Sequence, residues 1–127
     1  MNLKKLRKSF SYALRGLGFV FRHEQNFRIQ IFCGIIALLA AFVLQISPTR
    51  FMILLFTCTL VLILECINTA IEGVSDIVKP RLSEQVEMIK DIMAGAVLLA
   101  SFFAVIIGIC IFWPYLTHFQ VEGLPNL

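Results

Sequence analysis

The sequence predicts an all-α integral membrane protein in which three membrane-spanning helices follow an N-terminal amphipathic helix. Of its 127 residues, 59% are hydrophobic and only 15% are charged, against about 25% charged residues in typical soluble domains. Residues 29–49, 51–64 and 92–121 contain no Asp, Glu, Lys or Arg. Because a helix needs about 20 mostly apolar residues to cross a bilayer, we expect spans at residues 29–47, 51–72 and 92–113. Together they form a single membrane domain, residues 1–127, with no nucleic-acid partner.

Residues 3–26 are expected to form the amphipathic helix. Apolar side chains recur there every three or four positions, while Lys and Arg occupy the other faces; the apolar stripe consists of Leu3, Leu6, Phe10, Leu14, Leu17 and Phe21. This pattern is typical of a helix that lies in the headgroup layer of a membrane. For the segment taken alone, a simple basic anchor is an equally good interpretation.

The placement of positive charge predicts the orientation in the membrane. Seven of the 11 Lys and Arg residues lie in residues 1–28, three lie in residues 73–91, and Arg50 alone lies between the first two spans. Cytoplasmic segments carry the excess of positive charge. We therefore expect a cytoplasmic N-terminus, a second helix that extends to residue 78, a cytoplasmic loop at 79–91 and an external tail at 114–127.

An acidic stripe ends the second span, where the helical pattern continues without a turn signal. At helical spacing its members face one side; they are Glu65, Asn68, Glu72 and Asp76. A charged side chain inside a bilayer costs roughly 2.5–3.5 kcal/mol, which favours a functional role. Glu24, the only acid in the first 64 residues, is a candidate ligand or an interfacial residue paired with Arg28 four positions later.

These acids, together with Lys90 and Asp91, are all expected near the cytoplasmic face, where carboxylates and an Asn suit a hard cation such as Mg²⁺. Phosphoryl transfer requires such a metal, a cationic group on the phosphates and a proton acceptor. Lys90 suits the second role, and Glu65, the deepest acid, suits the third. The chain has no G-x-x-x-x-G-K-[ST] loop, so a nucleotide site must be built differently. A small proton-coupled transporter that uses Glu65 and a structural membrane subunit remain alternatives.

Two motifs of the chain resemble the prokaryotic diacylglycerol kinase family, which includes the undecaprenol kinases. They are Glu65-x-x-Asn-Thr-Ala-Ile-Glu72-x-x-x-Asp76 and Lys90-Asp91-x-x-Ala-Gly-Ala96-Val. Tyr12-x-x-Arg-Gly-Leu17 and Glu24-x-Asn-Phe-Arg28 also match, and the resemblance covers about residues 5–113. It implies an ATP-dependent lipid kinase that uses Mg²⁺ in the bacterial inner membrane. It further implies a homotrimer whose active sites lie between subunits at the cytoplasmic interface, where ATP meets a lipid alcohol.

The resemblance also implies roles for individual residues. Glu65 would be the catalytic base and would contact the lipid substrate together with Asn68. Glu24 and Glu72 would hold the metal. The nucleotide would be bound by Tyr12, Gly16, Asn68, Glu72, Asp76, Lys90 and Asp91.

The chain departs from the family pattern at two places. Gln30 stands where the Gram-negative diacylglycerol kinases usually carry an acid, and the Gln-Asn-Phe that follows Glu24 is more similar to the undecaprenol kinases; both slightly favour undecaprenol over diacylglycerol as the substrate. Residues 81–89 lack the His- or Gly-containing loop common in relatives.

Overall fold

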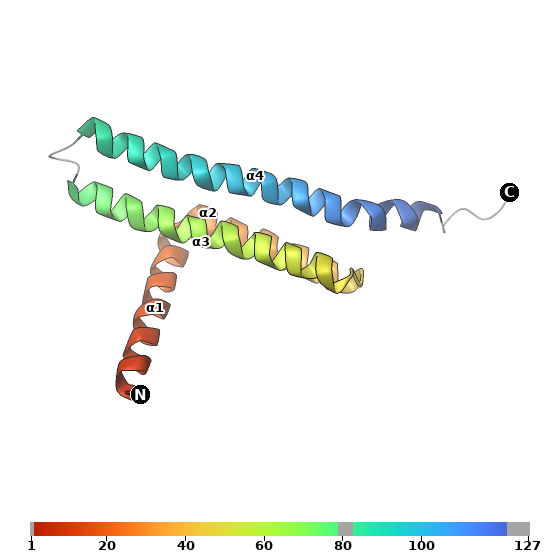
Figure 1. Cartoon of the computed structure of the whole chain (residues 1–127), viewed down its shortest axis with the longest axis horizontal. Helices are drawn as coiled ribbons and strands as arrows, with labels where there is room; N and C mark the ends of the chain where they lie inside the picture. Colours follow the sequence, from red (N-terminus) through yellow and green to blue (C-terminus); the bar gives the residue numbers. More distant parts are fainter. Residues whose placement is uncertain (1, 79–82, 122–127) are drawn as a thin grey trace.

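The computed structural model describes residues 2–78 and 83–121, and almost all of them are helical. The helices are α1 (Leu3–His23), α2 (Gln25–Val43), α3 (Pro48–Val78) and α4 (Ser83–Val121) (Figure 1). Three of them, α2, α3 and α4, are long and apolar enough to cross a membrane. The expected all-α chain with three such helices is confirmed.

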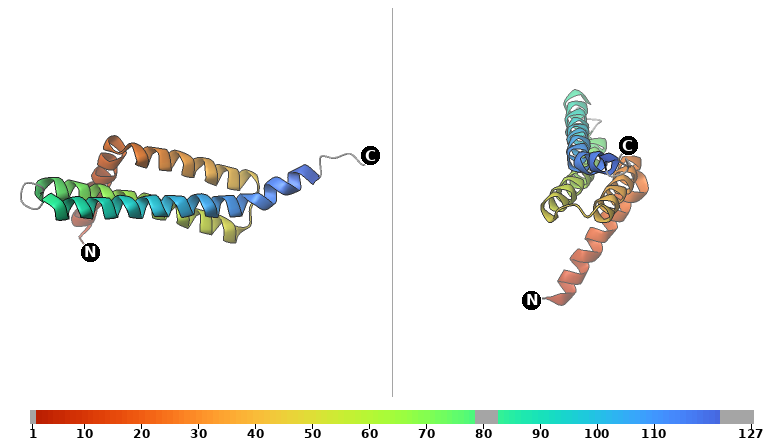
Figure 2. Two further views of the ribbon diagram at one scale, coloured as in Figure 1. Left: turned by 90° about the horizontal axis from the view of Figure 1, so that it is seen from above. Right: turned by 90° about the vertical axis from the view of Figure 1, so that its right-hand side faces the viewer.

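The three long helices run alongside one another, and α1 projects from them at a steep angle (Figures 1 and 2). The central helix is α3, which packs against α2 and α4 and also contacts α1. Among the described residues, the buried polar side chains all belong to α3: Thr57, Glu65, Asn68, Thr69 and Ser75.

The outer faces of the bundle are apolar and uncovered. Phe42 on α2 is 77% exposed and Val105 on α4 is 62% exposed, and many other large apolar side chains of these helices are exposed as well. Continuous apolar surface of this extent marks contact with lipid or with another protein. A bilayer is the environment that a helix set of this composition requires.

The corner between α1 and α2 forms at Glu24. Its backbone is extended, with φ −97° and ψ 114°, so α1 ends at His23 rather than at residue 26 as expected. Arg28 fixes the corner, because its Nη1 donates hydrogen bonds of 3.0 Å to the backbone oxygens of both Phe21 and Arg22. A cation at the C-terminus of a helix is stabilising, and these bonds occupy Arg28 with the backbone and leave Glu24 free to face α3.

The turn between α2 and α3 is a Schellman motif. The N–H of Ile46 donates to the carbonyl of Ala41 at 3.1 Å, and the N–H of Gln45 donates to that of Phe42 at 3.2 Å. Gln45 occupies the left-handed position of this motif, with φ 49°, where Gly is usual. The first apolar helix therefore covers residues 25–43 instead of the expected 29–47. It begins earlier because the chain re-enters the helical conformation directly after Glu24, and it ends earlier because Gln45 reverses the backbone.

A small apolar core holds this turn against the end of α4. It contains Ala41, Ile46, Leu54 and Ile111, which are at most 8% exposed. The next helix begins at Pro48, a position where the missing N–H costs nothing.

Helix α4 is longer than the sequence indicated. It begins at Ser83, so most of the expected loop at 79–91 is helical, because good helix formers such as Glu84, Gln85 and Lys90 fill this stretch; residues 79–82 lie outside the described residues. At its other end α4 continues through Pro114 to Val121, into the expected tail at 114–127, of which residues 122–127 also lie outside the described residues. A proline removes one helical hydrogen bond and bends a helix without ending it, and Figure 2 shows α4 bending towards its C-terminal end.

Candidate functional site

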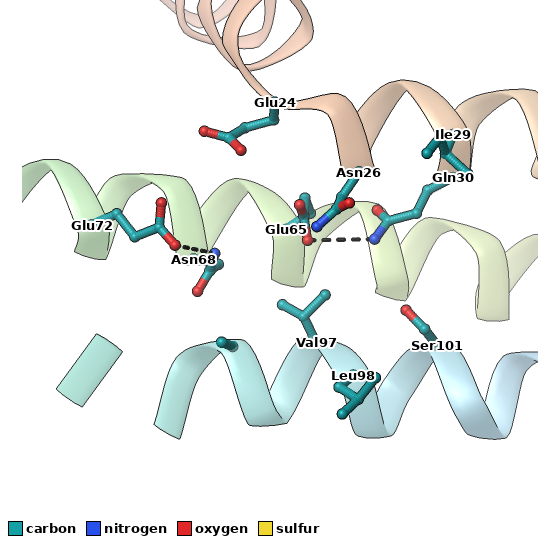
Figure 3. Close-up of a pocket in the computed structure, with 11 residues that line it drawn as sticks. Glu24, Asn26, Ile29, Gln30, Glu65, Asn68, Glu72, Val97, Leu98 and Ser101 are labelled. Atoms are coloured by element: carbon teal, nitrogen blue, oxygen red, sulfur yellow. Dashed lines mark hydrogen bonds between the residues drawn. The ribbon is translucent and has the colours of Figure 1, made fainter. Parts of the chain in front are cut away.

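A pocket of about 500 Å³ opens where α2, α3 and α4 meet, beside the corner between α1 and α2 (Figure 3). We call it the acidic pocket because it contains three of the eight carboxylates in the chain. Its lining consists of Glu24, Asn26, Ile29, Gln30, Glu65, Asn68, Glu72, Ala94, Val97, Leu98 and Ser101. Four of the predicted site residues are among them: Glu24, Glu65, Asn68 and Glu72.

Glu65 is the most deeply buried acid of the pocket, with 2% of its surface exposed. Its Oε2 accepts a hydrogen bond of 3.4 Å from Nε2 of Gln30 on α2. Its backbone oxygen accepts a hydrogen bond of 3.0 Å from the Thr69 hydroxyl. Burying a carboxylate is costly unless its oxygens are hydrogen-bonded, and Glu65 has one such partner. A carboxylate with a free oxygen in an apolar surrounding is well suited to accept a proton.

Asn68 and Glu72 lie one turn apart on α3 and are joined by a side-chain hydrogen bond. Nδ2 of Asn68 donates to Oε1 of Glu72 at 2.9 Å. This bond turns the other end of the amide, Oδ1, into the interior, where it is buried without a hydrogen-bond partner. A buried acceptor without a partner costs about 1–3 kcal/mol, so a bound donor or cation at this position would recover that free energy.

Glu24 reaches the pocket from a different element. The extended backbone at the corner between α1 and α2 places it above the stretch of α3 that carries Glu65 and Glu72 (Figure 3). Glu24 and Glu72 present carboxylate oxygens, and Asn68 presents the unpartnered amide oxygen.

This donor set fits Mg²⁺. No group of three or more His, Cys, Asp or Glu side chains with metal-binding geometry occurs within residues 2–78 and 83–121. Mg²⁺ does not require one, because it is commonly held by one or two carboxylates and completes its shell with water and phosphate oxygens. Two carboxylates and an amide oxygen in one pocket satisfy that pattern.

Five predicted site residues do not line the acidic pocket of the single chain. Tyr12, on α1, is 54% exposed, with Lys8 and Arg15 each 5.8 Å from the centre of its ring. Gly16, one turn further, has open space around it. Lys90 and Asp76 form an ion pair of 3.0 Å between α4 and α3, and Asp91 is exposed beside them.

The structure adds pocket residues that were not assigned a role from the sequence. Gln30, whose Oε1 is also buried without a partner, departs from the family pattern, and the sequence predicts no catalytic or binding role for it. Asn26 lies within the Glu24-x-Asn motif and received no role of its own. Ser101 carries the only hydroxyl between Ile92 and Phe112, a signal that could have identified it. The apolar lining residues Val97 and Leu98 had no distinguishing signal.

Comparisons with known proteins point to one family. The family model for prokaryotic diacylglycerol kinase matches residues 11–112. A diacylglycerol kinase of Synechocystis sp. is 41% identical over 114 residues, which are 89% of this chain and 65% of that protein. An undecaprenol kinase of Bacillus subtilis is 32% identical over 90% of this chain and 93% of its own length. A diacylglycerol kinase of Escherichia coli is 29% identical over 87% and 91% of the two chains.

The matched region includes α2 and α3, the greater part of α1 and of α4, and every residue that lines the acidic pocket. The chain spans about two thirds of the length of the Synechocystis relative and nearly the whole of the Bacillus relative. The chain belongs to the prokaryotic diacylglycerol kinase family.

Proposed function

We propose that this chain is an integral-membrane lipid kinase that transfers the γ-phosphoryl group of ATP to the hydroxyl of a lipid alcohol. The observation that carries the proposal is the acidic pocket, which gathers a buried carboxylate, two further carboxylates and an unpartnered amide oxygen between apolar helices. Phosphoryl transfer requires a bound metal and a base for the attacking hydroxyl; the carboxylates suit these two roles, and the apolar helices suit a membrane lipid.

Glu65 is the catalytic base in this mechanism. Its free carboxylate oxygen takes the proton of the lipid hydroxyl as the hydroxyl oxygen forms a bond to the γ-phosphorus. The bond between that phosphorus and the bridging oxygen breaks, and ADP leaves with the electron pair. The burial of Glu65 excludes water, which would otherwise compete with the lipid as the acceptor. Asn68 lies one turn away and helps to orient the lipid hydroxyl.

The remaining polar residues bind the nucleotide and its metal. Glu24 and Glu72 hold Mg²⁺, with Asn68 in support; when bound, the cation neutralises charge on the phosphates. The five residues outside the pocket (Tyr12, Gly16, Asp76, Lys90 and Asp91) contact the nucleotide. In our proposal the chain forms a homotrimer, and a neighbouring subunit brings such residues to each pocket.

The membrane arrangement follows from the lengths of the helices and the placement of charge. With 31 residues, α3 is about 46 Å long at 1.5 Å per residue, which exceeds the roughly 30 Å of a hydrocarbon core. The end that carries the acidic stripe therefore emerges from the bilayer. We propose that this end faces the cytoplasm of a bacterium, where ATP is available, with the N-terminus inside and the C-terminus outside.

For the lipid we favour undecaprenol slightly over diacylglycerol. The relatives carry both names, so the preference rests on the neutral Gln30 and on the apolar lining that surrounds Glu65. The residues on this side of the pocket are Ile29, Val97 and Leu98. A hydrocarbon chain next to the hydroxyl fits such a lining better than ester carbonyls, which need hydrogen-bond donors.

A labelled-phosphate assay in mixed micelles tests the proposal. Purified protein receives radiolabelled ATP, Mg²⁺ and either undecaprenol or diacylglycerol, beside the variant Glu65→Gln and the control Glu84→Gln, which alters an exposed acid outside the pocket. We expect label in a lipid with wild type and with the control, and a loss of about 10²–10⁴-fold with Glu65→Gln. Labelling that survives in Glu65→Gln would remove the base from the mechanism. Absence of label from both lipids with folded wild type would reject the kinase and return attention to proton-coupled transport.

A further inference from the structure

We infer that Gln30 is a positioning residue for Glu65. The Gln30 side chain orients the Glu65 carboxylate before proton transfer and stabilises the protonated group afterwards. The inference rests on the proposed role of Glu65 as the base. Gln30 is held by α2 and Glu65 by α3, 35 residues further along the chain. Their hydrogen bond is thus a tertiary contact across the interface that forms one wall of the acidic pocket (Figure 3).

The orientation of the amide follows from the chemistry of its partner. An ionised carboxylate only accepts hydrogen bonds, so the –NH₂ end of Gln30 must face Oε2 of Glu65, as it does at 3.4 Å. The opposite orientation would bring two acceptor oxygens together. With one oxygen of Glu65 held by Gln30, the other remains available for the lipid hydroxyl. The bond is long, and contacts of this kind commonly tighten only when substrate is bound.

A neutral amide is well matched to a carboxylate that must gain a proton. Lys or Arg in the same place would form a charge-assisted pair with Glu65, which would hold the carboxylate in its ionised state and weaken it as a base. Gln30 donates a hydrogen bond without adding charge. Because the amide is neutral, it also avoids the cost of placing a second charge among the apolar side chains of α2 and α3 in the bilayer.

The amide can also serve Glu65 after the proton has moved. A protonated carboxyl group is a donor, and Gln30 has an acceptor, Oε1, that is buried without a partner. Rotation of the amide by half a turn brings this oxygen to the new O–H of Glu65. The unpartnered Oε1 thereby gains a role in the second half of the reaction, and one side chain stabilises both protonation states of the base.

Steady-state kinetics of Gln30 variants tests the inference. Gln30→Met keeps the length of the side chain but removes both hydrogen-bonding groups, and Gln30→Asn keeps the amide but is one methylene too short to reach Glu65. We expect each to lower kcat by about 10–100-fold, since a misplaced catalytic group costs about that much. KM for ATP should change less than about twofold, because the hydrogen bond of Gln30 is to the base and not to a proposed metal ligand. Gln30→His, which offers a ring N–H at a similar distance along the side chain, should recover part of kcat.

The matched control is Gln25→Met, the same substitution on the same helix at an exposed position outside the pocket, which should leave kcat unchanged. Thermal unfolding in detergent identifies any variant that fails to fold. If Gln30→Met does not fold, Gln30→Asn, which retains a polar side chain, still tests the inference. If a folded Gln30→Met or Gln30→Asn has the wild-type kcat while Glu65→Gln is inactive, the positioning role of Gln30 is overturned and the role of Glu65 as the base stands. Full activity of Glu65→Gln would instead reject the base on which the inference depends.

Discussion

Glu72, a proposed metal ligand, has a carboxylate that a neighbouring side chain already holds in place. Its Oε1 is held by the amide of Asn68 at 2.9 Å, so the carboxylate is oriented before any cation arrives. Oxygen ligands that are already oriented bind a hard cation without a further loss of side-chain entropy. The second carboxylate, from Glu24, is brought to the same pocket by the corner between α1 and α2.

We predict that Glu72→Gln weakens metal-dependent turnover without unfolding the protein. The new amide keeps an oxygen that can accept the hydrogen bond from Asn68, but it removes the charge that attracts Mg²⁺. The Mg²⁺ concentration that gives half-maximal activity should rise by about 10-fold or more. A Mg²⁺ titration of initial rate at fixed ATP measures it, with Glu87→Gln, an exposed acid outside the pocket, as the control. An unchanged Mg²⁺ requirement would exclude Glu72 as a ligand.

At the scale of single residues, the sequence predicted what helical spacing can reveal. Glu65, Asn68 and Glu72 share a face because they recur at three and four positions, and all three line the acidic pocket. Asp76 continues the same spacing but lies beyond the pocket and pairs with Lys90 on α4. Periodicity within one helix cannot show how far a neighbouring helix covers it.

Gln30 and Ser101 are pocket residues that periodicity within α3 cannot reveal, because they belong to neighbouring helices. They reach Glu65 and its pocket from α2 and α4, and contacts between helices leave no periodic trace in one sequence. Glu24 was singled out because it is isolated in charge, and its place in the pocket depends on a corner that no local pattern specified. The catalytic, metal-binding and nucleotide-binding roles of the site residues remain predictions.

Among the elements, the turn between α2 and α3 determines how the three long helices stack. Gln45 adopts a left-handed backbone there, with φ 49°, and its neighbours Ala41 and Ile46 are buried against α3 and α4. A side chain in this conformation costs roughly 1–2 kcal/mol because Cβ approaches the following carbonyl. Glycine avoids that contact.

We predict that Gln45→Gly stabilises the folded protein. Relief of the left-handed strain outweighs the extra freedom that glycine gives to the unfolded chain, and the net gain in the free energy of unfolding should be about 0.5–1 kcal/mol. Thermal or denaturant unfolding in detergent measures the gain. Gln45→Ala, which loses the amide but keeps Cβ, is the matched control and should show no gain; a stability of Gln45→Gly equal to or below that of the control would show that the backbone conformation is not strained.

Whole helices were easier to predict from the sequence than the places where they end. Charge-free runs located α2, α3 and α4, because crossing a bilayer requires continuous apolar length. Their ends depend on capping and on breaks that compete with propensity. Helix α1 stops at Glu24 although its neighbours favour a helix, and α4 passes through Pro114 because one proline removes only part of the hydrogen bonding of a long helix.

As a whole molecule, the single chain leaves most of its apolar surface uncovered. Only 11% of the most apolar stretch is buried in α2 and in α4, against 28% in α3. Lipid can cover such faces, and so can further copies of the chain. The arrangement of α1 favours the second possibility for part of this surface: it projects away from the bundle (Figure 1), and it carries Tyr12 and Gly16 outside the acidic pocket of its own chain.

If the neighbouring subunit of a trimer supplies α1 to each pocket, two inactive chains should restore activity when they assemble together. One chain carries Glu65→Gln and the other carries Tyr12→Ala with Gly16→Leu. In a trimer that contains both kinds of chain, about one site in three combines an intact pocket with an intact α1, so these mixed trimers should regain roughly a third of wild-type kcat. The labelled-lipid assay measures it on doubly tagged trimers purified through both tags.

The matched control is the pair Glu65→Gln and Glu72→Gln, whose two residues line the same pocket of one chain. Because every pocket in that mixture carries one defect, its activity should not rise above the average of the two variants assayed alone. Recovery in the first pair but not in the second would establish that the catalytic unit is the interface between subunits, with the pocket from one chain and α1 from the next. Recovery in neither pair would instead place the whole site within one chain and would require α1 to fold back over its own pocket when ATP binds.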